Sequence, residues 1–192
     1  MSGRAAIDND FLNHLLDIKN STDLSELIRK FFKALHVSVF MHQFVYEREA
    51  IIVENSTREA LVLDNTIEII QVADTWKNIP GGKEYYSMMV QEIYKSFTGK
   101  EYPCAMFNDW RAGYSLGEVH TVVACAFIMC DCFLSDDRGA ATYLQGIVQR
   151  KLNHPIHIYN RQNRCEFIRS LAPAEREGLT SHELKMISHP IR

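Results

Sequence analysis

The sequence has little of what marks membrane or secreted proteins. None of its apolar runs approaches the length of a membrane span, and its first residues, Met1 to Arg4, lack the apolar region of a secretory signal. The five cysteines are an odd number, and several lie in apolar segments, which argues against a disulfide framework. We therefore expect reduced thiols, no contact with a membrane and a cytoplasmic protein.

The chain also lacks a strong charge of either sign and several well-known motifs. A net charge of −3 excludes a strongly basic nucleic-acid binder. The sequence has no glycine-rich phosphate loop, no internal repeat and no paired cysteine spacing typical of zinc sites. With 192 residues, of which 46% are hydrophobic, it fits one domain over residues 1–172 followed by a C-terminal helical tail over 173–192.

What the sequence does have is two acidic pairs, each placed after a short apolar stretch. Asp8 and Asp10 follow the first stretch, and Ser135-Asp136-Asp137 closes a later one. Ligands collect at the carboxyl ends of strands in open parallel sheets, so these pairs suggest a single site. Carboxylates packed together repel one another unless a cation neutralises them, and hard oxygen ligands suit Mg²⁺ or Mn²⁺. The pattern predicts a metal-dependent enzyme acting on phosphate esters.

Short β-branched or apolar segments alternate with amphipathic helical stripes along the chain. This alternation predicts an α/β protein with a three-layer α/β/α fold and a central parallel sheet. The region 55–104 looks mostly helical and is expected to be a helical insertion. The expected strands are residues 5–7, 37–40, 132–134 and 156–159.

Each acidic residue has an ordinary structural explanation when taken alone. Asp8 could cap a helix, Glu118 could complement a helix dipole, and Glu47 could be a surface residue in the middle of a helix. Taken together, acids at two strand ends and on two adjoining helices form a cluster of the kind that binds two cations in nucleases.

Four segments together resemble the PIN domain, the fold of VapC-type toxin ribonucleases and of several RNA-processing nucleases. The family's features are an Asp after the first strand, a strand followed by a helix bearing a Glu, an acid at the start of a long apolar helix, and a strand ending in Thr/Ser-x-Asp. The corresponding segments are residues 7–15, 37–47, 116–120 and 133–140.

The resemblance implies a set of catalytic acids, an overlapping set of metal ligands and supporting residues beside them. The catalytic acids are Asp8, Glu47, Glu118 and Asp137, although the sequence does not decide between Glu47 and Glu49. The metal ligands are Asp8, Glu118, Asp136 and Asp137, and the supporting residues are Asp10, Ser135 and Arg138. The implied activity is endonucleolytic cleavage of RNA with Mg²⁺ or Mn²⁺ as cofactor, in a toxin held by an inhibitor protein (an antitoxin).

Two other functions stay open. Asp8-Asn9-Asp10 also resembles the Asp-x-Asp of haloacid-dehalogenase-type phosphatases, but Leu12 stands where that family has Thr or Val, and no convincing lysine motif is present. A PIN-like fold with a degenerate site could instead serve as a binding module for RNA or protein. The Met- and aromatic-rich region 55–104 could also bury against a partner or a second copy, giving a homodimer.

Two further features lie near the proposed site. His42 and His120 are expected to be packed or surface side chains rather than ligands. The stretch from Arg138 to Arg169 is basic, with one acidic residue, and could either hold a phosphate backbone or form a solvated helix face. Its cationic residues are Arg138, Arg150, Lys151, Arg161, Arg164 and Arg169.

Overall fold

The computed structural model describes residues 3–19, 21, 23–50, 55–103, 115–130, 132–152 and 154–189. These residues form a five-stranded, all-parallel sheet with the strand order β3-β2-β1-β4-β5. The predicted three-layer α/β/α architecture is therefore confirmed. The strands are β1 (Gly3–Ile7), β2 (Val37–His42), β3 (Ile67–Ile70), β4 (Cys132–Leu134) and β5 (His157–Tyr159).

The helices between the strands follow from local capping signals as well as from apolar periodicity. Asp23 caps its helix by accepting a hydrogen bond from Glu26 N, and Thr180 with Glu183 forms a capping box. The α-helices are α1 (Asn9–Leu16), α2 (Leu24–Ala34), α3 (Gln43–Val45), α4 (Ser56–Leu63), α5 (Gly82–Thr98), α6 (Leu116–Phe127), α7 (Gln145–Leu152), α8 (Arg161–Ser170) and α9 (Ser181–Ser188). The π-helical segments are η1 (Tyr46–Ala50) and η3 (Ala140–Leu144), and the 3₁₀ segments are η2 (Val72–Thr75) and η4 (Pro173–Glu175).

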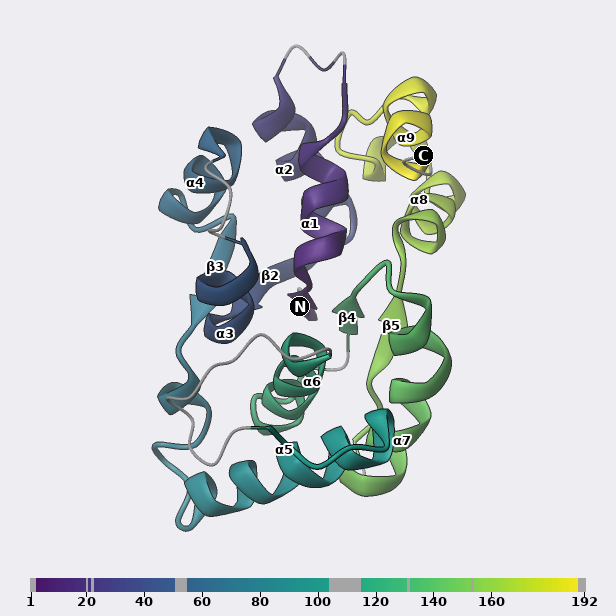
Figure 1. The fold of residues 1–192 in the computed structure, drawn as a ribbon. Coiled ribbons are helices and arrows are strands. Elements are labelled where there is room, and N and C mark those ends of the chain that lie inside the picture. The colour runs from purple at the N-terminus through teal and green to yellow at the C-terminus, as the bar shows by residue number, and fades with distance from the viewer. Residues whose placement is uncertain are drawn as a thin grey trace.

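The sheet separates two hydrophobic cores, because successive side chains of a strand point to opposite faces. Ala6 of β1 and Phe133 of β4 belong to the core beneath α5, α6 and α7. Ala5 and Ile7 of β1 and Leu134 of β4 belong to the other core, with α1, α2, α8 and α9. Figure 1 shows these two groups of helices on opposite sides of the sheet.

The structure adds one strand to the four that the sequence predicts. Residues 67–70, inside the region expected to be helical, form β3 at the edge of the sheet beside β2. This strand is short, and the residues before and after it are helical, so the apolar pattern of the whole region resembled that of helices. Strand β3 is therefore part of the central sheet, α4 packs with α2 beside it, and α5 is the long helix of the remaining part.

The C-terminal helix α9 packs on the same core as α8. Leu184 and Ile187 are fully buried there. Of the thiols, Cys125 and Cys165 are buried and form no disulfide, as expected. In the part of the chain that the structure describes, no helix is both long and apolar enough to cross a membrane.

Candidate functional site

The acidic residues gather where the strand order reverses. The chain leaves β1 for β2 and β3 on one side, then returns to place β4 and β5 on the other. Ile7 at the end of β1 lies beside Leu134 at the end of β4 in the parallel register. Asp8 and Ser135 therefore emerge side by side at the carboxyl ends of two neighbouring strands. Such a switch point is where open parallel sheets bind ligands.

Asp8 is the central carboxylate of this cluster and is only 4% exposed. Its Oδ1 atom accepts a 2.8 Å hydrogen bond from Asn9 N at the start of α1. Its Oδ2 atom accepts a 3.2 Å hydrogen bond from Ser135 Oγ. One oxygen thus caps the first helix while the other faces the loop after β4, so the capping and the site functions do not exclude each other.

Ser135 connects Asp8 to Asp137, the predicted catalytic acid that follows β4. Its fully buried hydroxyl donates to Asp8 and accepts a 3.1 Å hydrogen bond from Asp137 N. The exposed carboxylate of Asp137 accepts a 2.8 Å hydrogen bond from Ala140 N at the start of η3. Asp10, the second acid of the first pair, accepts hydrogen bonds from Phe11 N at 2.6 Å and from Asp136 N at 3.4 Å.

Two glutamates approach the cluster from two further helical segments. Glu118 lies in the first turn of α6, and Glu49 lies in η1. These segments can approach closely because residue 117 is glycine. A Cβ at that position would lie 2.5 Å from Glu49 Oε1 and 3.1 Å from a methyl group of Val45, so a larger residue would displace the Glu49 side chain.

The pKa values show that these carboxylates interact with one another. Burial raises the pKa of Asp8 well above its usual value, and Asp10, Glu118 and Glu49 raise it further. Burial and then the charges of Glu118 and Asp10 raise the pKa of Glu49 to about 7. The pKa of Glu118 is raised by burial, Asp137 and Asp10, and that of Asp10 by burial and Asp136. Loss of negative charge, through protons or a cation, therefore stabilises the cluster.

The sequence-based choice of Glu47 requires a correction. Glu47 is exposed, and its Oε1 atom accepts a 2.7 Å hydrogen bond from Gln43 on the same helical segment. Glu49 is the residue of this segment whose carboxylate interacts with Asp8 and Glu118. The structure thus favours Glu49 as the acid that η1 supplies.

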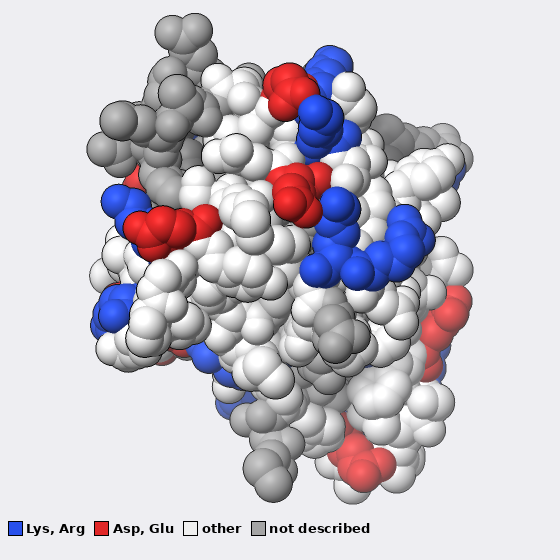
Figure 2. All heavy atoms as spheres, turned by 90° about the horizontal axis from the view of Figure 1, so that it is seen from below, with Lys and Arg blue, Asp and Glu red and all other residues white. Residues whose placement is uncertain are grey.

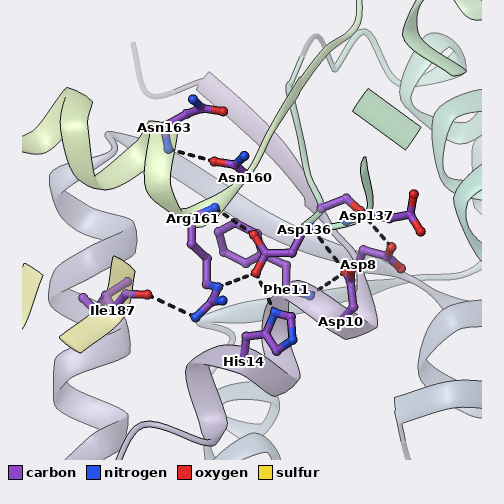
Figure 3. Close-up of polar contacts among 11 residues, drawn as sticks. Asp8, Asp10, Phe11, His14, Asp136, Asp137, Asn160, Arg161, Asn163 and Ile187 are labelled. Atoms are coloured by element: carbon purple, nitrogen blue, oxygen red, sulfur yellow. Dashed lines mark hydrogen bonds and ion pairs between the residues drawn. The ribbon is translucent and has the colours of Figure 1, made fainter. Parts of the chain in front are cut away.

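The predicted ligand Asp136 faces the opposite way from the other acids. Its Oδ2 atom is in an ion pair with Arg161 Nε and lies 2.6 Å from His14 Nδ1, and its Oδ1 atom accepts a 2.9 Å hydrogen bond from Arg161 N. Figure 3 shows this carboxylate directed at Arg161 and His14, whereas Asp137 points away from them. Asp136 therefore holds α1 and α8 to the end of β4, and Asp137 is the acid of this pair that faces Glu118.

The predicted supporting residue Arg138 is exposed. Within the described ranges we find no hydrogen bond or ion pair of its side chain to the acidic cluster. Its position directly after Asp137 keeps it near the site.

A buried polar network lies behind the cluster. Tyr86 Oη is 3.1 Å from His42 Nε2 and 3.2 Å from His120 Nδ1, and Phe44 N donates to His42 Nδ1. Burial lowers the pKa of His42 to about 3 and also lowers that of His120, so both imidazoles are neutral. The network joins α6, which carries Glu118, to the end of β2 and to α5. Both histidines are packed side chains, as the sequence analysis expects.

The oxygen donors and the electrostatics of the cluster are of a kind that a divalent cation would complement. Asp8, Glu49 and Glu118 are buried or half-buried carboxylates whose negative charges disfavour one another, and a cation relieves that repulsion. Within the described residues, however, no three His, Cys, Asp or Glu side chains already stand in a ligand arrangement. Binding of an ion therefore requires these side chains to close around it.

We compared the chain with protein-family models, with curated proteins and with solved structures, and none of the three comparisons found a match.

Proposed function

We propose that the protein is a divalent-metal-dependent endoribonuclease of PIN-like type. The observation that carries this proposal is the mutual interaction of Asp8, Glu49 and Glu118 at the switch point of the parallel sheet. Asp137 joins them through Glu118 and through the Ser135 hydroxyl. Four carboxylates from four segments far apart in sequence suit Mg²⁺ or Mn²⁺, and such ions serve phosphodiester hydrolysis.

In this proposal some residues bind the cation and others position the ligands. Asp8, Glu49 and Glu118 are the proposed ligands, and Asp137 lies at the exposed rim, where a phosphate group approaches. A bound cation would supply an activated water and neutralise charge on the phosphate. Ser135 holds Asp8 and the Asp137 backbone in register, which makes it a positioning residue. Arg138 at the rim is free to contact a phosphate oxygen.

The phosphatase alternative has less support from the structure. That chemistry places a lysine beside the nucleophilic aspartate. The hydrogen-bond partners found for the Asp8 carboxylate in the described residues are Asn9 N and Ser135 Oγ, and its charged neighbours are carboxylates. The inhibitor protein that the resemblance implies and the homodimer suggested by the Met- and aromatic-rich region 55–104 stay predictions.

The direct test is incubation of labelled RNA with Mg²⁺ or Mn²⁺, comparing the wild type with Asp8→Asn and Glu49→Gln. We expect each substitution to lower the cleavage rate at least about 100-fold, because each removes a ligand charge. Chelation of the metal with EDTA should abolish cleavage in the wild type.

The matched control is Glu47→Gln, two residues from Glu49 but exposed and outside the cluster. We expect this variant to cleave RNA as fast as the wild type. Equal cleavage by Asp8→Asn and the wild type would show that the activity does not come from this site. Loss of activity in Glu47→Gln with full activity in Glu49→Gln would restore the sequence-based assignment.

A further inference from the structure

A groove of about 410 Å³ lies between the end of α5 and the face formed by η3 and α7. Phe97 of α5 forms one wall, and Tyr143 of η3 forms the other. Arg150 and Lys151 in the last turn of α7 also line it. The volume is within the range of sites that bind small organic groups, so a nucleobase or a ribose phosphate can enter.

Aromatic and cationic side chains share this groove in a way that suits single-stranded nucleic acid. Tyr143 is 66% exposed, so its ring is accessible to a base. Successive bases stack on such rings, while Lys and Arg track the phosphates. Figure 2 views the molecule from below, the side on which α5 and α7 lie in Figure 1, and shows several Lys and Arg side chains on part of this face, with Asp and Glu side chains beside them.

One end of the groove, at Phe97, lies near Asp137 of the acidic cluster. Asp137 Oδ1 lies 2.9 Å, and the ring of Phe97 lies 3.9 Å, from the position that a Cβ of Gly139 would take. Asp137 also accepts the hydrogen bond from Ala140 N that begins η3, and Tyr143 follows within the same segment. A strand lying in the groove is thereby led to the rim of the proposed catalytic site.

The charges of the groove differ from those of the other basic residues in this half of the chain. On α8, Arg161 pairs with Asp136, Arg164 lies 3.5 Å above the ring of Tyr159, and Arg169 donates to Leu184 O. These three arginines thus hold the fold together. The basic stretch from Arg138 to Arg169 therefore has two different parts on α7 and α8. The arginines of α8 contact the fold, whereas Arg150 and Lys151 of α7 line the groove.

One acidic residue limits the positive charge of the groove. Lys151 Nζ lies 3.2 Å from Glu92 Oε2 on α5, and both side chains are partly exposed. An exposed ion pair of this kind contributes little free energy, so a phosphate group can replace the Glu92 carboxylate. For the Arg150 guanidinium we find no carboxylate partner within the described ranges.

We infer that this groove binds the single-stranded part of an RNA that flanks the cleaved bond, with a base stacked on Tyr143 and phosphates on Arg150 and Lys151. The identification of the strand as a substrate rests on the proposed endoribonuclease function, whereas the binding itself does not. An acidic peptide, which is also negatively charged but is a protein, is the alternative partner that the experiment must exclude.

The test measures binding without cleavage, using the Asp8→Asn variant and a fluorescein-labelled single-stranded oligouridylate. We expect Arg150→Gln with Lys151→Gln to weaken binding at least about tenfold at low salt and to reduce the slope of log K against log[salt] by about 1.4, since two phosphate contacts are lost. Tyr143→Ala should weaken binding about tenfold without changing the salt slope, because stacking is not ionic.

Two matched variants separate the proposed contacts from general effects. Tyr143→Phe keeps the ring and should bind as tightly as the parent protein. Glu92→Gln removes the acid that competes for Lys151, so it should bind more tightly, by a few-fold. All substituted side chains in these variants are exposed, so the far-ultraviolet circular dichroism spectrum should not change.

Failure of this inference is distinguishable from failure of the proposed function. RNA cleavage by the wild type together with unchanged binding in the groove variants would overturn the groove and leave the nuclease intact. Binding that depends on the groove variants, in a protein that cleaves no RNA, would overturn the nuclease function and leave the groove intact. Absence of oligouridylate binding, or tighter binding of a polyglutamate peptide than of the oligonucleotide, would overturn the groove as an RNA site.

Discussion

Ser135 Oγ donates a hydrogen bond to Asp8 Oδ2 across the neighbouring strands β1 and β4, although the two residues are 127 positions apart. The same hydroxyl accepts a hydrogen bond from Asp137 N. One buried side chain thus fixes two of the acids relative to each other. The sheet aligns the ends of β1 and β4, and the two hydrogen bonds of Ser135 then position Asp8 relative to the backbone of Asp137.

The substitution Ser135→Ala tests this connection. It removes the hydrogen bond to Asp8 and leaves Asp137 N without this partner, so we expect the free energy of unfolding to fall by about 1–2 kcal/mol. Urea denaturation followed by circular dichroism measures the change. Ser56→Ala, at an exposed position of α4, is the control and should be nearly neutral. Equal stability of the two variants would contradict a structural role for the hydroxyl.

Removal of the charge of Asp8 should stabilise the metal-free protein. Asp8 is buried among Asp10, Glu118 and Glu49, and an asparagine keeps the hydrogen bond from Asn9 N while it removes the repulsion. In EDTA at pH 8, we expect Asp8→Asn to unfold at a higher temperature, by an amount corresponding to about 1 kcal/mol. Calorimetry measures the shift. A lower melting temperature would show that the carboxylates do not oppose one another.

Added metal should instead make the wild type more stable than Asp8→Asn. An ion that binds only the folded state raises the melting temperature with its concentration, so Mg²⁺ or Mn²⁺ should stabilise the wild type and have little effect on Asp8→Asn. The comparison needs no RNA. A wild type whose melting temperature does not respond to either ion would argue against the proposed cation site.

The raised pKa of Glu49 predicts how stability depends on pH. Its pKa is about 7 in the folded protein and near 4.5 when unfolded, so its protonated form favours folding. This contribution is fully present below about pH 4.5 and is lost as the pH rises through about 7. It amounts to roughly 3 kcal/mol at most.

Glu49→Gln isolates that contribution. The neutral histidines His42 and His120 act in the opposite direction, because their lowered pKa values make the fold less stable as the pH falls below 6.5. Both proteins contain these histidines, so their effect cancels in the difference between wild type and Glu49→Gln. In EDTA, we expect the variant to gain stability relative to the wild type between pH 4.5 and 7. A constant difference over this range would contradict the assigned pKa.

Asp136 and Asp137 should respond in opposite ways to the same substitution. Asp136→Asn leaves the buried Arg161 without its counterion, so we expect a loss of about 3 kcal/mol in stability. Asp137→Asn keeps a good cap for η3 and should leave stability almost unchanged, but it should slow RNA cleavage. Parallel denaturation and cleavage assays test both. An Asp136→Asn variant that is stable but does not cleave RNA would show that Asp136, and not Asp137, is the catalytic acid of the pair.

Much of the fold could be predicted from the sequence because its signals are local. The short apolar stretches of β1, β2, β4 and β5 and the amphipathic stripes between them predicted the element order and the parallel sheet. Strand β3 was missed because its four residues lie at the sheet edge, between helices, where Glu68 is exposed and the apolar run is short.

The site was predictable only to within a residue or two. Which of Glu47 and Glu49 turns inward depends on the π-helical geometry of η1, and a sequence pattern based on 3.6 residues per turn does not contain that geometry. Asp136 and Asp137 follow the end of β4, where the alternation of strand side chains no longer applies. The partners that separate them, His14 and Arg161, lie far away in the sequence.

The glycine at position 117 has a consequence for how this protein can vary. A glycine within a helix weakens that helix by up to about 1 kcal/mol relative to alanine, yet here the missing methyl group is what admits Glu49 beside Glu118. Alanine at this position would strengthen α6 and at the same time drive one negative charge out of the cluster. Helix strength and charge density at this site therefore cannot both be maximal, and the chain as it stands favours charge density.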